Sequence, residues 1–114
     1  MLRLPFTLPE DGLREIKGFV SLDLEFVVLE VETAIAGILG KEETTIKVAP
    51  SALDDAWLKT GLVRDRLCLA PSKVDLLKAV PGDHAREIAL RIPRKYRLDT
   101  EDLVDELSRR IDAA

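Results

Sequence analysis

The chain has 114 residues, a length typical of one compact domain. Its single Cys and single His exclude an internal disulfide and a Cys/His zinc cluster, and any nucleophile–histidine site would depend on His84 alone. The net charge of −4 is uneven, since residues 1–57 carry 5 basic and 11 acidic side chains, whereas residues 58–114 carry 12 and 10. This acidic balance makes nucleic acid an unlikely partner.

The sequence favours a soluble cytoplasmic protein. Apolar runs are far shorter than the roughly 20 residues that a membrane-spanning helix needs, and the start of the chain lacks the apolar stretch of a signal peptide. Cys68 lies in the apolar segment Leu67–Ala70 and is interpreted as a small core residue. A lone cysteine fits a reducing compartment.

The first third of the chain predicts an arm followed by a hairpin. Residues 1–12 are expected to form an irregular N-terminal arm, because Pro5 and Pro9 disfavour both a helix and a paired strand. Residues 13–112 are expected to form a single domain. It opens with apolar residues at every second position from Ile16 to Leu22, the period of a strand. Residues 25–33 repeat this alternation, and the short connection near Asp23 predicts an antiparallel hairpin.

The middle of the chain predicts further strands. In chain order we expect a loop over residues 34–40, a strand over 44–48, strands over 56–60 and 66–70 with a bent link between them, a turn over 81–84 and a strand over 86–93. The segment 73–80 fits a helical turn and a strand equally. The expected total is six or seven short strands.

A helix is predicted over residues 99–112. Asp99 is suited to cap its N-terminus, and basic Arg109 and Arg110 in the last turn complement the helix dipole. The apolar residues fall on one stripe, formed by Leu103, Val104, Leu107 and Ile111. So short a helix must dock on another element to be stable. The predicted fold class is α+β, a bent antiparallel sheet or partly open barrel capped by one amphipathic C-terminal helix.

The order of these elements resembles a pleckstrin-homology-like domain over about residues 13–112. The likeness is carried by local segments at matching places in that order: Val27–Glu32, Ile46–Pro50 followed by Leu53, Trp57–Gly61 running to Arg66–Leu69, Val80–Gly82 before Glu87–Ile92, and the helix from Asp99. The resemblance implies a bent sheet closed by the helix, a fold that hosts many unrelated functions.

Two departures from that family restrict what the resemblance implies. Family members that bind phosphoinositides carry basic residues around the loop between strands one and two, whereas here Ser21–Glu25 is acidic and would repel phosphate. Eukaryotic members tend to carry a Trp in the terminal helix, and this helix has none. The likeness therefore favours a bacterial or divergent member of the family and does not carry over the lipid site.

Several local patterns are weighed as chemical sites and rejected. Gly37–Lys41 resembles part of a phosphate loop, but Ile35 stands where the first Gly is required and Glu42 where a Ser or Thr is required. Adjacent carboxylates on a strand point to opposite faces, so Glu42–Glu43 and Asp54–Asp55 do not converge as acid and base. His84 follows a turn and lacks further ligands. We therefore expect no enzymatic activity, no cofactor and no metal.

One basic cluster and two aromatic residues remain as candidates for an interaction surface. The candidate residues are Arg91, Arg94, Lys95, Arg97, Phe26 and Trp57. Cations from residue 86 to residue 97 either balance the acidic first half or meet an anionic partner. Phe26 and Trp57 are either core residues or exposed contacts at an interface.

The function expected from the sequence is that of a protein-interaction or assembly module. Its partner is either another protein or a second copy of the chain, because apolar side chains lie on both faces of the strand over 25–33. The alternative is a peripheral binder of anionic membrane surfaces through residues 91–97. An enzyme acting through carboxylates and His84 is the third and weakest hypothesis.

Overall fold

In the computed structural model, which describes residues 3–35, 40–80 and 86–114, seven strands form one antiparallel sheet with a C-terminal helix. The elements in chain order are β1 (Arg3–Asp11), β2 (Arg14–Leu22), β3 (Val27–Ile35), β4 (Lys41–Val48), β5 (Leu53–Lys59), β6 (Arg64–Pro71), β7 (Ile88–Pro93) and α1 (Arg97–Ala113). Short 3₁₀ turns, Pro50–Ala52, Val74–Leu77 and Arg94–Tyr96, join them. The strand order across the sheet is β4-β3-β2-β1-β7-β6-β5.

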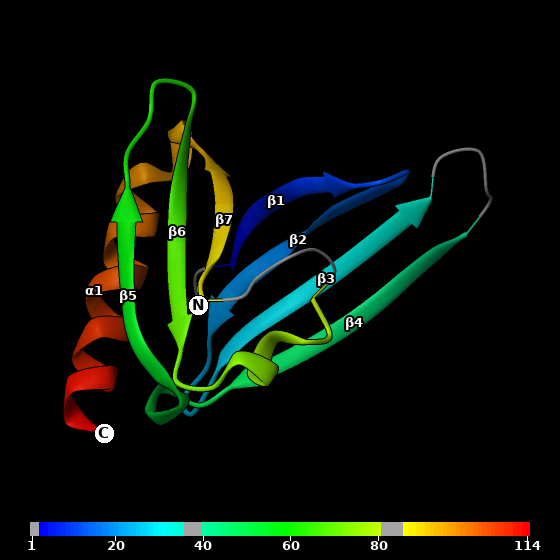
Figure 1. Ribbon diagram of the computed structural model, residues 1–114. Coiled ribbons are helices and arrows are strands. Elements are labelled where there is room, and N and C mark those ends of the chain that lie inside the picture. The colour runs from blue at the N-terminus through cyan, green and yellow to red at the C-terminus, as the bar shows by residue number, and fades with distance from the viewer. Residues whose placement is uncertain (1–2, 36–39, 81–85) are drawn as a thin grey trace.

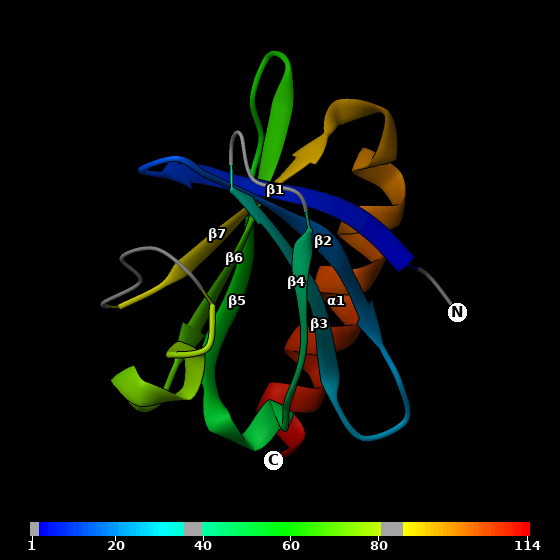
Figure 2. The same ribbon diagram turned by 90° about the vertical axis from the view of Figure 1, so that its right-hand side faces the viewer.

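The sheet is strongly bent, so that its two ends face each other like the sides of an open barrel. Figure 1 shows β5, β6 and β7 on one side with α1 beside them, and β1 to β4 on the other. The view turned by 90° in Figure 2 shows α1 behind the sheet. The fold class predicted from the sequence is confirmed: a bent antiparallel sheet of seven strands with one helix at the C-terminus.

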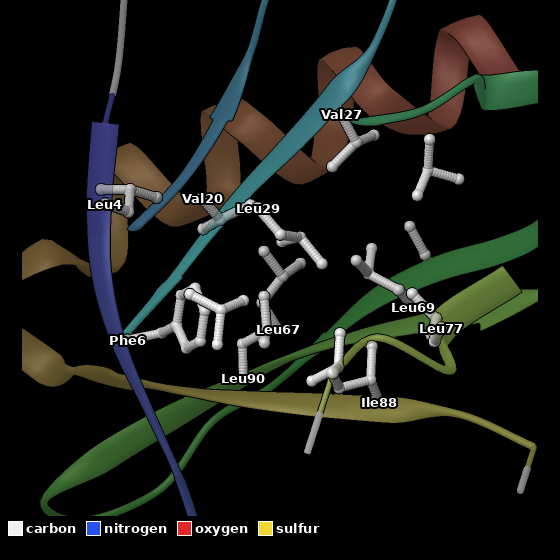
Figure 3. Close-up of a cluster of buried hydrophobic side chains, with 14 of the residues drawn as sticks. Leu4, Phe6, Val20, Val27, Leu29, Leu67, Leu69, Leu77, Ile88 and Leu90 are labelled. Carbon is white, nitrogen blue, oxygen red and sulfur yellow. The ribbon is translucent and has the colours of Figure 1, made fainter. Parts of the chain in front are cut away.

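The core fills the inside of this bend. Alternate residues along the strands point inward, including Leu4 of β1, Leu29 of β3 and Leu90 of β7, none more than 1% exposed. These side chains meet from both ends of the sheet (Figure 3). Burial of so many large apolar side chains drives the folding of the chain, because each contributes roughly 1.5–3 kcal/mol relative to exposure. The side of the sheet away from the core is called the outer face below.

The helix packs against the core through the apolar stripe predicted from the sequence. Leu103 and Leu107 enter the core, and Val104 and Ile111 pack at its margin. The helix begins at Arg97, two residues before the predicted start, and no side chain caps it. Asp99 lies in its first turn instead, where its negative charge still favours the helix dipole.

The N-terminal arm is the main correction to the sequence prediction. Residues 3–11 form β1, which pairs with β2 from Arg3↔Ser21 to Leu8↔Ile16. Pro5 and Pro9 were expected to prevent this pairing because each lacks an N–H donor. Burial of the intervening Leu4, Phe6 and Leu8 outweighs that loss. The ladder between β1 and β7 is correspondingly short, with the single register pair Thr7↔Arg91.

The remaining differences are of position. The strand expected over 25–33 lies at 27–35 and the one expected over 56–60 begins at Leu53, with a bulge between Leu53 and Asp55. The connection near Asp23 is confirmed as a tight turn, in which the Asp23 carboxylate accepts backbone N–H groups of Glu25 and Phe26 at 2.7 and 2.6 Å. The ambiguous segment 73–80 contains the 3₁₀ turn Val74–Leu77. The predicted turn over 81–84, with His84, and most of the loop 34–40 lie outside the described residues.

One glycine allows β2 and β3 to approach. A Cβ atom at Gly18 would lie 1.8 Å from the carbonyl oxygen of Glu30, so any side chain at this position would collide with the backbone of β3. Gly18 therefore holds β3 close against the middle of β2, where the outer face carries Phe19 and Glu30 side by side in the register.

Candidate protein-interaction face

A single row of mostly charged residues crosses the outer face of all seven strands. The register places Lys59 opposite Arg66, Arg66 opposite Arg91, and Arg91 opposite Thr7. It continues from Thr7 to Lys17, from Lys17 to Glu32 and from Glu32 to Glu43. Residues directly opposite each other share a face of the sheet. We call this set, Lys59, Arg66, Arg91, Thr7, Lys17, Glu32 and Glu43, the charge row.

The basic end of the charge row consists of cations that stand next to one another. Lys59 and Arg66 are exposed and Arg91 is half-buried. Among the residues that the structure describes, none of the three forms an ion pair. Like charges directly opposite each other in a sheet destabilise it. The basic end is therefore an unneutralised positive surface that the fold itself does not need.

The acidic end is arranged differently. Glu32 binds Lys41 at 2.9 Å and lies 3.7 Å from Lys17, and the hydrogen bond from Lys41 holds the pKa of Glu32 below its usual value. In the neighbouring row Glu30 binds Arg3 through two contacts of 2.7 and 3.3 Å, which lower the pKa of Glu30 in the same way. Most charges on this half of the face are thus matched within the chain.

A hollow of about 720 Å³ lies over the middle of the charge row. Five row members line it, and the neighbouring wall carries Phe19, whose ring is covered by the Arg3 guanidinium at 3.8 Å from its centre. Arg64 and Arg91 bring positive charge to its rim from β6 and β7, while Glu30 and Glu43 bring negative charge from β3 and β4. The hollow thus changes sign from one side to the other.

Trp57 lies beside the basic end of the charge row. It precedes Lys59 by two residues on β5, so both share the outer face, and Cys68 stands opposite it on β6. Trp57 is half-buried and Cys68 is fully buried. Burial raises the pKa of the Cys68 thiol. The full burial agrees with the interpretation of Cys68 as a small buried side chain, although it lies on the outer face beside Trp57 and not inside the bend of the sheet. A half-exposed Trp next to unpaired Arg side chains has the composition of a binding hot spot.

The predicted basic cluster 91–97 is divided by the structure. Arg91 belongs to the charge row, Lys95 is exposed with its ammonium 5.3 Å from the Tyr96 ring, and Arg94 is exposed with a guanidinium contact of 3.4 Å to the Leu62 carbonyl. Arg97 points to the link between β5 and β6 and is bound there. The segment does not present its four cations on one surface.

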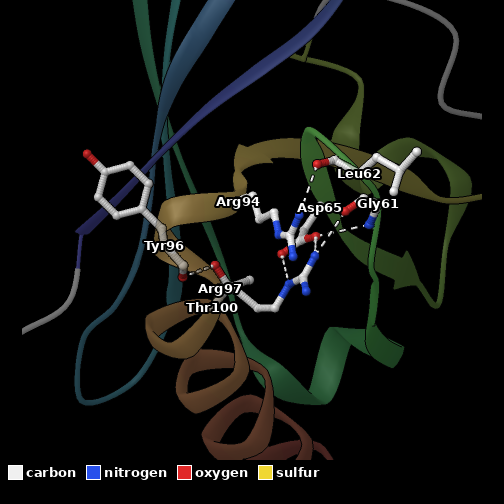
Figure 4. Close-up of polar contacts among 7 residues, drawn as sticks. All are labelled: Gly61, Leu62, Asp65, Arg94, Tyr96, Arg97 and Thr100. Atoms are coloured by element: carbon white, nitrogen blue, oxygen red, sulfur yellow. Dashed lines mark hydrogen bonds and ion pairs between the residues drawn. The ribbon is translucent and has the colours of Figure 1, made fainter.

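Arg97 forms a two-contact ion pair with the fully buried Asp65 (Figure 4). Its Nε and Nη2 donate to the two carboxylate oxygens at 2.9 and 2.8 Å, and Nη2 also donates to the Gly61 carbonyl at 3.0 Å. The Gly61 N–H donates to the same carboxylate at 3.0 Å. These contacts, above all the bond from Arg97, hold the pKa of Asp65 below its usual value.

This ion pair anchors the hairpin tip, residues 60–63, to the start of α1. A side chain at Gly61 would collide with the Arg64 carbonyl oxygen, at 2.3 Å from the added Cβ, so the tight link requires glycine. The anchored tip exposes two apolar side chains, Leu62 at 90% and Val63 at 75%. They form a small apolar projection at the tip that links β5 and β6, and Figure 4 shows Leu62 beside the ion pair.

Phe26 is separate from the charge row. It lies just before β3 and is half-buried, with the Lys47 ammonium 5.9 Å from its ring. The candidates Arg91 of β7 and Trp57 of β5 thus share the outer face of the sheet with β6 between them, whereas Phe26, Arg94, Lys95 and Arg97 lie apart from this part of the face. Lys59 and Arg66 were missed from the sequence. Both residues lie in strands that flank a short link, so they can share one face of a hairpin. The register that aligns them with Arg91 depends on pairing across the whole sheet.

Within the described ranges, no three His, Cys, Asp or Glu side chains are grouped as metal ligands. In the same part of the chain, no helix combines the length and the apolar character required to cross a membrane. Scans against protein-family models, curated proteins and solved structures returned no match to the chain.

Proposed function

We propose that this protein is a non-enzymatic interaction module that binds another protein through the outer face of its sheet. The observation that carries the proposal is the charge row, which passes from three unpaired cations at β5, β6 and β7 to two carboxylates at β3 and β4. A surface that changes sign within one row recognises a partner with a matching division of charge.

This division favours a protein over the other anionic partners. Lipid headgroups and nucleic-acid phosphates present negative charge throughout, and such a surface would meet Glu43 on the same face, which forms no ion pair among the described residues. A protein surface with an acidic and a basic part avoids that conflict. Trp57 beside the basic end supplies the apolar contact around which binding energy concentrates.

The alternative is peripheral binding to anionic lipid by residues near the hairpin tip. It is supported by the exposed Leu62 and Val63 next to Arg94 and Lys95, a combination of apolar and basic groups that suits a membrane interface. The pairing of Arg97 with Asp65 counts against it, because it removes one of the four cations of the 91–97 segment from that role.

The experiment compares the wild-type protein with the double variant R66E/R91E and the matched control K78E/R109E. The control also reverses two cations, and both Lys78 and Arg109 are exposed outside the charge row. Each protein is immobilised and its retained proteins are quantified by mass spectrometry from a lysate of the source cells. Each is also sedimented with vesicles rich in phosphatidylserine at physiological salt.

We expect at least one protein to be retained by the wild type and the control and reduced about tenfold or more with R66E/R91E, since reversal places like charges across the contact. Vesicles are expected to leave all three proteins in the supernatant. Retained proteins that are the same for all three would overturn the proposal. Sedimentation with vesicles that is lost in an R94E/K95E variant would replace it with the lipid alternative.

A further inference from the structure

The two edges of the sheet differ in what covers them. At one edge α1 packs along β5, and the Ser108 hydroxyl donates to the Ala56 carbonyl at 3.4 Å. At the other edge β4 pairs with β3 alone in the register of the described strands, and its residues 41–45 are exposed. Figure 1 shows β4 at the margin of the molecule opposite α1. An uncovered edge presents unpaired backbone N–H and C=O groups to a further strand.

Two charges on the outer face of β4 lack a complement across β3. Glu43 stands opposite Glu32, whose carboxylate already binds Lys41. Lys47 stands opposite Val28. In the described part of the chain neither Glu43 nor Lys47 forms an ion pair. Both side chains are exposed and lie on the strand at the uncovered edge.

We propose that two copies of the chain join through β4, edge to edge and antiparallel, about a two-fold axis at Thr45. This register places Glu43 of each copy opposite Lys47 of the other, which makes two ion pairs, and places the two Thr45 side chains opposite each other. Opposite charges and Thr–Thr pairs directly across a sheet are both stabilising. A two-fold contact of this kind uses the same surface of both copies and closes on itself.

The neighbouring registers are disfavoured by charge. Centring the pair on Thr44 brings Lys41 opposite Lys47 of the second copy, and centring it on Glu43 brings that carboxylate opposite itself. Centring it on Ile46 leaves Glu43 without a cation. Charged residues at an edge usually guard it against pairing. Here the same charges discriminate between registers and permit the one in which they match.

The inference goes beyond the proposed function. It shares Glu43 with the charge row, but the basic end of the row lies on β5, β6 and β7, away from this edge. Sedimentation of the chain without a partner tests the dimer separately from binding to another protein. The dimer nevertheless bears on that function. An axis perpendicular to the sheet leaves both outer faces on the same side, so the dimer presents two charge rows to one partner surface. Two linked sites bind a divalent partner more tightly than either does alone.

The test is sedimentation velocity of the full chain over a wide range of concentration, with the single variants E43K and K47E. Each variant places like charges opposite each other twice in its own dimer, so we expect dimer dissociation constants at least about tenfold higher than that of the wild type. An equimolar mixture of E43K and K47E is expected to restore dimers, because both contacts then join Lys to Glu. The double variant E43K/K47E is expected to dimerise by itself for the same reason.

The matched control is K59E, which reverses an outer-face charge on the covered edge strand and is expected to leave the dimer unchanged. A wild-type chain that stays monomeric at the highest concentration would overturn the proposal. So would dimers that E43K and K47E leave unaffected. Failure of the mixture to associate would rule out this register. Far-ultraviolet circular dichroism confirms that each variant is folded, and the mixture tests the contact with the same two proteins whose single effects were measured.

Discussion

The two halves of the sheet treat their outer-face charges in opposite ways. On β1 to β3 the outer-face charges are matched within the chain, as in the pair of Arg3 with Glu30 and the contacts of Lys17 and Lys41 with Glu32, and only at the β4 edge do Glu43 and Lys47 lack an ion pair among the described residues. On β5 to β7 the cations Lys59, Arg66 and Arg91 stand opposite one another, and none of them forms an ion pair with a carboxylate of the described residues. Most charges of the first half are therefore neutralised within the chain, whereas the cations of the second half remain exposed without a counter-charge. The difference shows that matched and unmatched charges are separated between the two ends of the sheet, and not only between the two halves of the sequence.

Among the described carboxylates of β5 to β7, the buried Asp65 is the one that forms an ion pair. It is the carboxylate on β6 and lies in the middle of the basic strands, yet it faces inward and binds Arg97 of the helix. The exposed cations of the row therefore receive no compensation from it. In this half of the sheet, the ion pair that stabilises the fold is the buried pair of Asp65 with Arg97.

The largest expected effect is that of Asp65→Asn. The change removes the carboxylate from a fully buried site and leaves the Arg97 guanidinium and the Gly61 N–H without their anionic acceptor. Breaking a buried pair on one side costs about 3 kcal/mol of the free energy of unfolding. Urea unfolding followed by circular dichroism measures it. A loss no greater than that of Glu30→Gln, at the exposed pair on the first half, would contradict the contrast drawn between the two pairs.

Lowering the pH is expected to reduce the free energy of unfolding by an intermediate amount. The pKa of Asp65 in the folded protein lies below its usual value, so the ion pair contributes stability that is fully present above the unfolded pKa of about 3.9 and is lost as pH falls below it. Glu30 and Glu32 contribute in the same direction. Urea unfolding at a series of pH values from neutral to about 3 tests this. The Asp65→Asn variant is expected to lose stability less steeply in acid than the wild type.

The smallest expected effect has the opposite sign. Arg66→Gln removes a cation that faces Lys59 on one side and Arg91 on the other. Relief of this repulsion is expected to raise the free energy of unfolding by up to about 1 kcal/mol, and the gain is expected to shrink as salt is added. Urea unfolding at low and high ionic strength measures both. A loss of stability at low salt would show that the basic end is not internally repulsive.

The strands and the helix could be predicted because their signals are local. The alternation through Val27, Leu29 and Val31 and the helical stripe from Leu103 to Ile111 both record which side faces the core. The failure at β1 has a physical reason as well. The alternation of Leu4, Phe6 and Leu8 indicates a strand, but Pro5 and Pro9 carry the stronger local signal against it, and only the rest of the sheet decides between the two. Membership of the pleckstrin-homology-like family stays a prediction.

The candidate surface could be predicted only in part. Trp57 and Arg91 are visible in the sequence as a rare aromatic residue and a member of a basic cluster. Their placement on one face depends on the order β7-β6-β5 in the sheet, and the register of these strands is set by contacts far apart in the chain. The separation of Arg97 from the basic cluster depends on its ion pair with the buried Asp65, 32 positions away. No local sequence pattern indicates this pairing.

The contact of α1 with β5 has a consequence for the size of any assembly. A sheet with two open edges has a valence of two, and identical copies can then add without limit to give a fibre. The helix leaves one open edge because it covers the β5 edge, where the Ser108 hydroxyl donates to the Ala56 carbonyl. The association proposed through β4 would therefore end at a pair. On this view the last element of the chain acts as a terminator of polymerisation as well as a part of the core.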